Sequence, residues 1–257
     1  MTPADVFKEY GPSVANIIAT NGQIRVASGS GFVVNRRMVT CAHVVNLPPG
    51  LNVEVRFGAV VAQQSREWVY PAFGQRPNIK GYSDEHSYDY AIIEPPSGAI
   101  LGSSLQFAED VPEVGEPVCC LGYPFEDPDL TLHHGFISAI FQSGVATMIK
   151  LDMSINPSNS GGPLIRLKDG AVVGVVARKA TGLSRAFAGL MRSYDQNISA
   201  LQRSIGLVGL GSVDPIAALV AGQRQMKSVS EEIARSANVG IGYAIFPSPL
   251  KEEPALS

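Results

Sequence analysis

Three separate segments of the 257-residue chain carry residue types that nucleophilic catalysis requires. His43 follows directly on one strand-like run, Asp89 stands at the head of another, and Ser160 lies in a turn-like segment over residues 156–164. A nucleophilic serine needs an exposed hydroxyl, a nearby base and backbone N–H groups aimed at the developing oxyanion. Two glycines follow this serine directly, and they allow both a tight turn and the close approach of a substrate.

Each segment also has an ordinary structural interpretation. A lone histidine among apolar residues is more often a core residue, an aspartate before a strand is often a turn residue, and a Ser-Gly-Gly run can be a plain hairpin turn. Taken together, however, His43, Asp89 and Ser160 follow one of the known chain orders of the Ser-His-Asp triad. The first two fall in a first group of predicted strands and the serine in a second, so we expect the site in the cleft between them.

Short strands separated by Gly, Pro and Asn turns must position these residues. The first group of predicted strands covers residues 14–20, 31–35, 38–42, 52–57 and 90–94. The second covers residues 116–121, 136–141, 145–151, 163–167 and 171–178. Many short strands without alternating helices favour antiparallel barrels or sandwiches over a parallel sheet. The sequence therefore predicts an all-β fold of two packed units, divided near residues 95–115.

The hydrophobic period changes in the last third of the chain. Apolar residues recur at helical spacing over residues 183–205 and again over 216–233. Asp214 and Pro215 have the pattern of a helix N-cap followed by proline at the first helical position. The prediction is a helical hairpin, a final strand and a loose tail, over residues 183–238, 240–246 and 247–257.

Composition excludes several classes of protein. Charged residues make up 17% and hydrophobic residues 45% of the chain, so a core can offset the entropy of ordering and the chain is expected to fold. Collagen, coiled coils and nucleic-acid-binding tails do not fit this composition. The net charge of −3 gives no electrostatic reason to expect nucleic acid or an anionic membrane as a partner. No apolar stretch of about 20 residues indicates a membrane span.

The cysteines and the N-terminus indicate a reducing compartment. The three cysteines are Cys41, Cys119 and Cys120, and the adjacent pair would point to opposite faces of a strand. An odd count with this spacing does not favour a disulfide framework. The N-terminal residues lack the basic region and apolar run of a signal peptide. We therefore expect a cytoplasmic location.

Several of these segments resemble one family. Residues 29–45, which contain His43, are similar to the histidine region of trypsin-like serine proteases, specifically those of the HtrA/Deg branch. Further similar segments lie at residues 115–118, 122–125, 135–139, 155–164 and 239–245. The resemblance covers about residues 6–180 and 239–247, and the serine motif with His and Asp in order is highly specific.

The resemblance implies a single peptidase domain of two packed antiparallel β-barrels with an inserted helical hairpin. Its parts would be the first barrel over about 12–105, the second over about 112–182 and 239–247, and the insertion over about 183–238. It also implies a serine endopeptidase that cleaves protein or peptide substrates through an acyl-enzyme, without a metal or other cofactor. No PDZ domain is expected in this chain.

The resemblance also assigns roles to residues of the site. His43 would be the general base, Asp89 would hold its imidazole, and Ser160 would be the nucleophile. The backbone N–H groups of Ser158 and Ser160, with Asn159 between them, would form the oxyanion hole. The remaining histidines are interpreted as surface-loop residues, because no ligand set with standard metal spacing accompanies them: His86, His133 and His134.

One position of the oxyanion hole differs from the family, and the substrate pocket leaves the specificity open. Ser158 stands where the family usually has glycine, so a positive φ there would strain the oxyanion hole or leave it collapsed until substrate binds, and we predict weak activity or a need for activation. The resemblance places the substrate pocket at Ser154, Ile155, Ala177, Arg178 and Lys179. The small, uncharged Ser154 favours small to medium apolar side chains before the scissile bond, whereas a lysine in the pocket wall would favour acidic ones.

The predicted insertion, residues 183–238, takes the place of a loop that normally shapes the specificity pocket. It could gate the site, bind an activator or mediate self-association, or it could be a structural hairpin alone. A rival hypothesis for the whole chain is a catalytically weak or inactive pseudoprotease that acts as a peptide- or protein-binding module.

Overall fold

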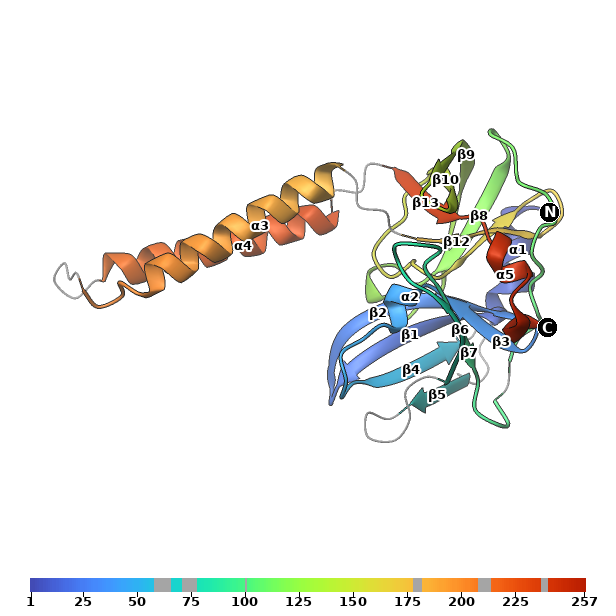
Figure 1. The fold of residues 1–257 in the computed structure, drawn as a ribbon, viewed down its shortest axis with the longest axis horizontal. Coiled ribbons are helices and arrows are strands. Elements are labelled where there is room, and N and C mark those ends of the chain that lie inside the picture. Colours follow the sequence, from blue (N-terminus) through green and yellow to red (C-terminus); the bar gives the residue numbers. More distant parts are fainter. Residues whose placement is uncertain (58–65, 71–77, 100, 178–181, 208–213, 237–239) are drawn as a thin grey trace. The chain divides into compact units, whose positions relative to one another are not determined.

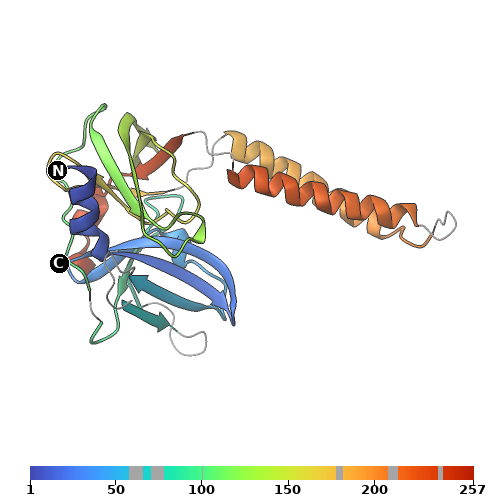
Figure 2. The same cartoon turned by 180° about the vertical axis from the view of Figure 1, so that it is seen from behind.

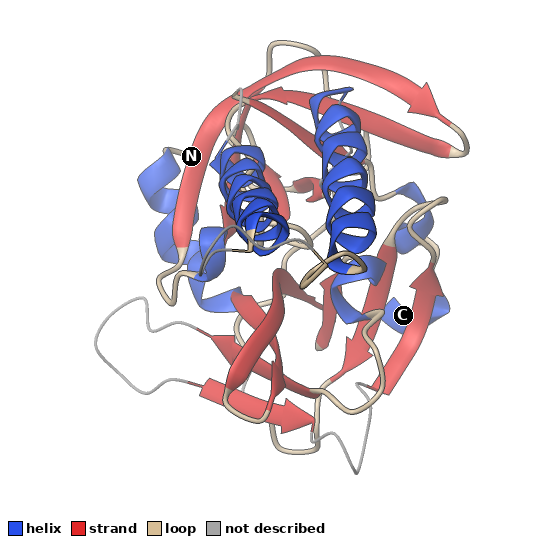
Figure 3. Cartoon of the chain, turned by 90° about the vertical axis from the view of Figure 1, so that its left-hand side faces the viewer, coloured by secondary structure: helices blue, strands red, loops and turns tan. Residues whose placement is uncertain are grey.

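A computed structural model gives the fold, and it describes all residues except 58–65, 71–77, 100, 178–181, 208–213 and 237–239. The chain forms two compact units. One unit comprises Met1–Arg178 together with Gly240–Ser257, and the other comprises Lys179–Val239. Strands, drawn in red in Figure 3, are the main elements of the first unit, whereas the second consists of two long helices.

The first half of the larger unit is a seven-stranded antiparallel sheet (Figure 1). Its strands lie in the order β5-β4-β1-β2-β3-β7-β6. Their bounds are β1 (Val14–Asn21), β2 (Ile24–Val34), β3 (Arg37–Thr40), β4 (Asn52–Phe57), β5 (Arg66–Tyr70), β6 (Asn78–Ser83) and β7 (Tyr90–Glu94). The predicted strand over residues 38–42 ends at Thr40, and the short helix α2 (Ala42–Val45) follows it.

The second half is a closed antiparallel barrel with strand order β10-β13-β12-β11-β8-β9. Its strands are β8 (Pro117–Gly122), β9 (Thr131–Ser143), β10 (Ala146–Asp152), β11 (Pro163–Arg166), β12 (Val172–Val176) and β13 (Ile241–Ile245). Strand β13 follows the helical unit in sequence, yet it pairs with both β10 and β12 and so closes the barrel. The predicted fold, two antiparallel β units with helices inserted before the last strand, is confirmed.

The described buried residues of this unit form two hydrophobic clusters. The larger contains residues of both halves, such as Phe32 and Ile165, and the smaller lies among barrel residues such as Ile149 and Ala244. Cys119 belongs to the larger cluster and Cys120 to the smaller, as expected for neighbours on one strand. All three cysteines are free and buried.

The helical unit consists of α3 (Gly182–Gln202) and α4 (Pro215–Ser236), which pack against each other. The Asp214 carboxylate accepts hydrogen bonds from the backbone N–H groups of Ile216 and Ala217, at 2.8 and 3.1 Å, and so caps α4 as its sequence predicts. Among the described residues, no helix has the length and apolar character needed to cross a membrane.

Short helices complete the larger unit: α1 (Pro3–Tyr10), η1 (Gly11–Ser13), η2 (Pro124–Glu126), α5 (Ser248–Lys251) and η3 (Pro254–Leu256). Both termini lie on the same side of this unit (Figures 1 and 2). The prediction of a loose tail over residues 247–257 is wrong, because Leu250 and Leu256 are buried in the larger cluster. The Tyr90 hydroxyl also donates to the Glu253 carboxylate at 2.7 Å.

Candidate active site

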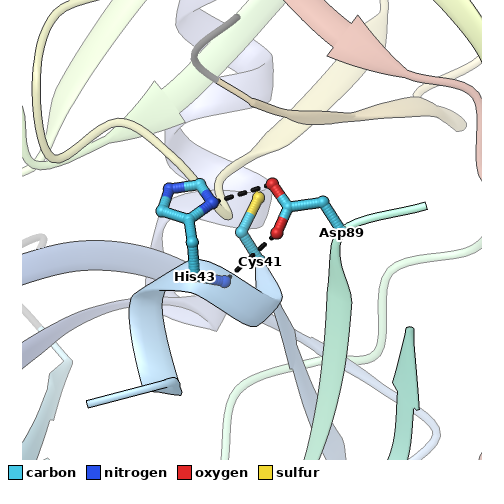
Figure 4. A group of neighbouring side chains, drawn as sticks. All are labelled: Cys41, His43 and Asp89. Carbon is cyan, nitrogen blue, oxygen red and sulfur yellow. Dashed lines mark hydrogen bonds and ion pairs between the residues drawn. The ribbon is translucent and has the colours of Figure 1, made fainter. Parts of the chain in front are cut away.

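His43 and Asp89 form a hydrogen-bonded pair at the start of helix α2 (Figure 4). The ring Nδ1 of His43 lies 2.7 Å from Asp89 Oδ2, and the backbone N–H of His43 donates to Asp89 Oδ1 at 3.1 Å. The carboxylate therefore fixes both the backbone and the ring of the histidine. With the proton held on Nδ1, the other ring nitrogen, Nε2, is left as a proton acceptor.

The backbone of Asp89 is unusual as well. Its φ of 47° lies in the left-handed region, which costs a non-glycine residue roughly 1–3 kcal/mol. The N–H of Asp89 donates to the carbonyl of Asp84 at 2.9 Å, so the turn before β7 closes on this residue. Asp89 as a whole is only 6% exposed, and burial strengthens the two hydrogen bonds of its carboxylate to His43. The turn thus holds a strained residue where its carboxylate meets the imidazole.

Cys41 stands beside this pair, and the three side chains place ligand-type atoms within 4.8 Å of one another. Each of them already has a partner, since the Cys41 thiol donates to the Val176 carbonyl at 3.3 Å and the other two bind each other. Burial, together with the nearby Asp89 carboxylate, raises the pKa of the Cys41 thiol well above its usual value. The thiol therefore stays protonated, and the cluster fits a His-Asp pair better than a metal site.

The loop that carries Ser160 packs against the segment that precedes His43. The Val176 carbonyl that accepts from Cys41 also accepts from the N–H of Gly161 at 2.8 Å. The carbonyl of Ser160 accepts from the backbone N–H of Ser30 at 2.7 Å. Ser160 is only 5% exposed, which differs from the exposed hydroxyl expected of a nucleophile, and within the described part of the chain its hydroxyl makes no hydrogen bond to His43. Such contacts often tighten only when substrate binds.

The backbone of this loop leaves two N–H groups available. Ser158 has φ of 73°, so the condition under which a serine at this position is strained is met. The carbonyl of Pro157 accepts from Phe125 N–H at 2.9 Å, and that of Ser158 accepts from the Ser30 hydroxyl at 2.8 Å. Among the hydrogen bonds of the described residues, the N–H groups of Ser158 and Ser160 donate to no acceptor. Two free donors two residues apart are what an oxyanion hole requires.

Asn159, between these two donors, is fully buried and contacts a histidine of the barrel. Its Nδ2 lies 3.1 Å from Nε2 of His133 on β9. The interpretation of His133 as a surface-loop residue is therefore wrong, because β9 begins at Thr131 and holds this side chain half-buried against the loop. His134 is exposed on the same strand, and His86 is exposed in a turn.

His133 is expected to make stability depend on pH. Burial lowers its pKa below the ordinary value of 6.5, so the unfolded chain binds this proton more tightly than the folded one. The free energy of unfolding should therefore fall as pH drops from about 6.5 through the lower folded-state pKa. Protonation would also place an N–H on Nε2 opposite the Asn159 amide donor.

Denaturant midpoints measured between neutral and acidic pH test this expectation. His133→Gln should lose part of the pH dependence, whereas the matched His134→Gln variant should keep it. An unchanged pH profile in His133→Gln would contradict the assignment.

The residues assigned to the substrate pocket are described only in part. Ser154 is half-buried in the segment between β10 and the serine loop. Ile155 and Ala177 are buried and belong to the hydrophobic clusters. Arg178 and Lys179 lie outside the described residues.

Three residues that contact the serine loop were not predicted from the sequence. They are Ser28 and Ser30 on β2, whose hydroxyls bond Ser158, and His133 on β9. Ser30 lies between two glycines just before the apolar end of β2, which is a local signal for a buried hydroxyl. No sequence pattern beside Ser28 or His133 marks them in this way, and for all three residues the partner itself cannot be read from the sequence, because it lies 130, 128 and 26 residues away for Ser28, Ser30 and His133.

A sequence model of the trypsin-like peptidase domain matches residues 29–175, more than half of the chain. Among curated proteins, serine protease HTRA1B of Danio rerio is 32% identical over 202 residues, which is 71% of this chain and 38% of the relative. Serine protease HTRA4 of Mus musculus is 30% identical over 200 residues, which is 71% of this chain and 38% of the relative. The chain thus spans about two fifths of the length of these relatives.

Solved structures share the fold. The HtrA-type protease AlgW with tripeptide aligns with a TM-score of 0.60 at 19% identity, over 98% of this chain and 62% of that one. The inactive form of Rv3671c from M. tuberculosis aligns with a TM-score of 0.55 at 20% identity, over 97% of this chain and 88% of that one.

Proposed function

The chain belongs to the trypsin-like peptidase family, and from that premise we propose that it is a serine endopeptidase acting through an acyl-enzyme on Ser160. One observation supports this most strongly. The Asp89 carboxylate binds Nδ1 of His43 at 2.7 Å, which leaves Nε2 free to accept a proton. A base oriented by a buried carboxylate, beside a loop that carries a serine, is the arrangement that activates a hydroxyl nucleophile.

In the proposed mechanism, Nε2 of His43 takes the proton of the Ser160 hydroxyl as Oγ attacks the carbonyl carbon of the scissile peptide bond. Asp89 stabilises the imidazolium that forms and does not itself take up a proton. His43 then delivers this proton to the leaving amine, and the C–N bond breaks. A water molecule then gives a proton to the same nitrogen as it attacks the acyl carbon. The ester bond between this carbon and Oγ breaks, the carboxylic acid product leaves, and His43 returns the proton to Ser160 Oγ.

The negative charge of the tetrahedral intermediate would rest on the carbonyl oxygen. We assign its stabilisation to the backbone N–H groups of Ser158 and Ser160, with Asn159 between them. The absence of a competing acceptor at either N–H in the described part of the chain supports this role. Removal of one such donor typically lowers kcat by about 10²–10³-fold.

Protein or peptide substrates fit the names of the relatives, which are serine proteases. For the residue before the scissile bond we propose a small to medium apolar side chain, because Ser154 is small and uncharged and its neighbour Ile155 is apolar. It stays a prediction that residues 183–238 gate the site, bind an activator or mediate self-association. The cytoplasmic location also stays a prediction.

Hydrolysis of a peptide library by the parent and by Ser160→Ala tests the proposal. The parent should cleave after small or apolar residues, and Ser160→Ala should not cleave. Ser97→Ala, which removes an exposed loop hydroxyl, serves as the matched control and should cleave like the parent. A profile dominated by arginine would contradict the proposed specificity. A folded parent that binds library peptides but cleaves none would favour the binding-module hypothesis.

A further inference from the structure

Two serine hydroxyls from distant parts of the chain meet at the serine loop. Oγ of Ser28 on β2 lies 2.6 Å from Oγ of Ser158, and either hydroxyl can be the donor. Ser158 is 9% exposed and Ser28 is half-buried, so the loop side of this hydrogen bond is shielded from water. A shielded hydrogen bond is harder to replace with solvent than an exposed one.

Strand β2 holds the loop at more than this one point. Ser28 and Ser30 are two residues apart, so their side chains share a face of the strand. The Ser30 hydroxyl donates to the Ser158 carbonyl at 2.8 Å, and the Ser30 N–H donates to the Ser160 carbonyl at 2.7 Å. Tyr123 N–H in turn donates to the Ser30 hydroxyl at 3.0 Å, which fixes its orientation. The strand therefore contacts both residues whose N–H groups would form the oxyanion hole.

Ser158 needs such contacts because its backbone is in an unfavourable conformation. Its φ of 73° is a left-handed value that glycine adopts freely and that serine adopts at a cost in energy. The peptide bonds on both sides of Ser158 are held through their carbonyls, by Phe125 N–H on Pro157 and by the Ser30 hydroxyl on Ser158. The bond to Ser28 is the contact in this set that depends on the side chain of Ser158, and a glycine could not make it.

We propose that Ser28 is a positioning residue for the oxyanion hole, because its hydroxyl holds the side chain of Ser158 and thereby keeps the N–H of Ser158 directed at the substrate carbonyl. The proposal rests on the proposed peptidase function and deepens it. It explains how this chain has serine in a left-handed conformation that favours glycine. Ser28 touches neither the substrate nor the nucleophile in this role.

A double-mutant cycle between Ser28 and Ser158 tests the proposal. Ser28→Ala, Ser158→Gly and the double variant are compared with the parent for kcat, KM and the free energy of unfolding. Ser28→Ala should weaken the hydrogen bond from the N–H of Ser158 to the oxyanion in the transition state. It should therefore lower kcat about 3- to 10-fold, with KM changed less than kcat. In the Ser158→Gly background the same substitution should leave kcat unchanged, because the partner hydroxyl is gone. Ser28→Thr keeps a hydroxyl and should restore the parent kcat.

The outcomes separate this inference from the function on which it rests. Equal losses of kcat in both backgrounds, or no loss in either, would overturn the positioning role while leaving the peptidase function intact. Coupling in unfolding free energy without coupling in kcat would also overturn it, since the bond would then be structural only. A parent that is folded but hydrolyses no peptide would overturn the proposed function and this inference with it.

Discussion

Asp89→Asn is expected to lower kcat by about 10⁴-fold while the protein stays folded. The carboxylate now accepts from both the backbone N–H and the Nδ1–H of His43, at 3.1 and 2.7 Å. An amide in its place can present its NH₂ group to Nδ1, and the ring proton then moves to Nε2. A histidine with its proton on Nε2 cannot accept the proton of the Ser160 hydroxyl. Steady-state kinetics on one cleaved peptide, with kcat and KM determined separately, measures this effect.

Asp84→Asn is the matched control for this substitution. Asp84 lies in the same turn, is exposed, and uses its carboxylate to accept from the N–H of His86 at 2.8 Å, without a hydrogen bond to His43. The kcat of Asp84→Asn should stay close to that of the parent. A change of less than tenfold in Asp89→Asn would mean that Asp89 does not orient the base.

Gly161→Ala is expected to lower the free energy of unfolding by about 2–5 kcal/mol, the sum of left-handed strain and overpacking. Gly161 has φ of 87°, and a Cβ at this position would meet the Ser30 carbonyl, the Thr40 hydroxyl and the Cys41 N–H. Two of these are backbone groups of β2 and the segment before His43, so they cannot rotate away. The loop would have to shift, and Ser160 with it. Denaturant unfolding and kcat are the two measurements.

Gly144→Ala isolates the part of this loss that comes from backbone strain. Gly144 also has a positive φ, 63°, in the turn between β9 and β10, but a Cβ there meets nothing within 4 Å. It should lower the unfolding free energy by only about 1–2 kcal/mol and leave kcat unchanged. Equal losses of unfolding free energy in Gly161→Ala and Gly144→Ala would contradict the close packing of the serine loop on β2.

The sequence predicted strands well where β-branched residues are dense and turn residues mark both ends. Strands β4 (Asn52–Phe57) and β7 (Tyr90–Glu94) have the predicted bounds. Strand β9 extends beyond its predicted range, 136–141, because its polar start at Thr131 pairs with β8. Strands β5 and β6 were missed, and β6 is rich in polar residues and contains Gly81.

The contacts around the candidate site could be predicted from the sequence only where a recognisable motif marks both residues. The positions of His43 and Asp89 beside strands and their order along the chain predict that the two meet, and in the structure Nδ1 of His43 lies 2.7 Å from Oδ2 of Asp89. The partnership of Ser28 with Ser158 depends on the packing of β2 against the loop, and no local pattern encodes it. The burial of Leu250 against the larger cluster is likewise a tertiary effect, invisible in a tail rich in proline and charge.

The most direct test of Ser160 as the nucleophile is covalent labelling with a fluorophosphonate probe. The parent and Ser160→Ala are incubated with the probe, digested, and searched for the adduct by mass spectrometry. The predicted result is one adduct, on the peptide that contains Ser160, in the parent and not in Ser160→Ala. A folded parent without an adduct at Ser160, or equal labelling of the alanine variant, would contradict the proposed function.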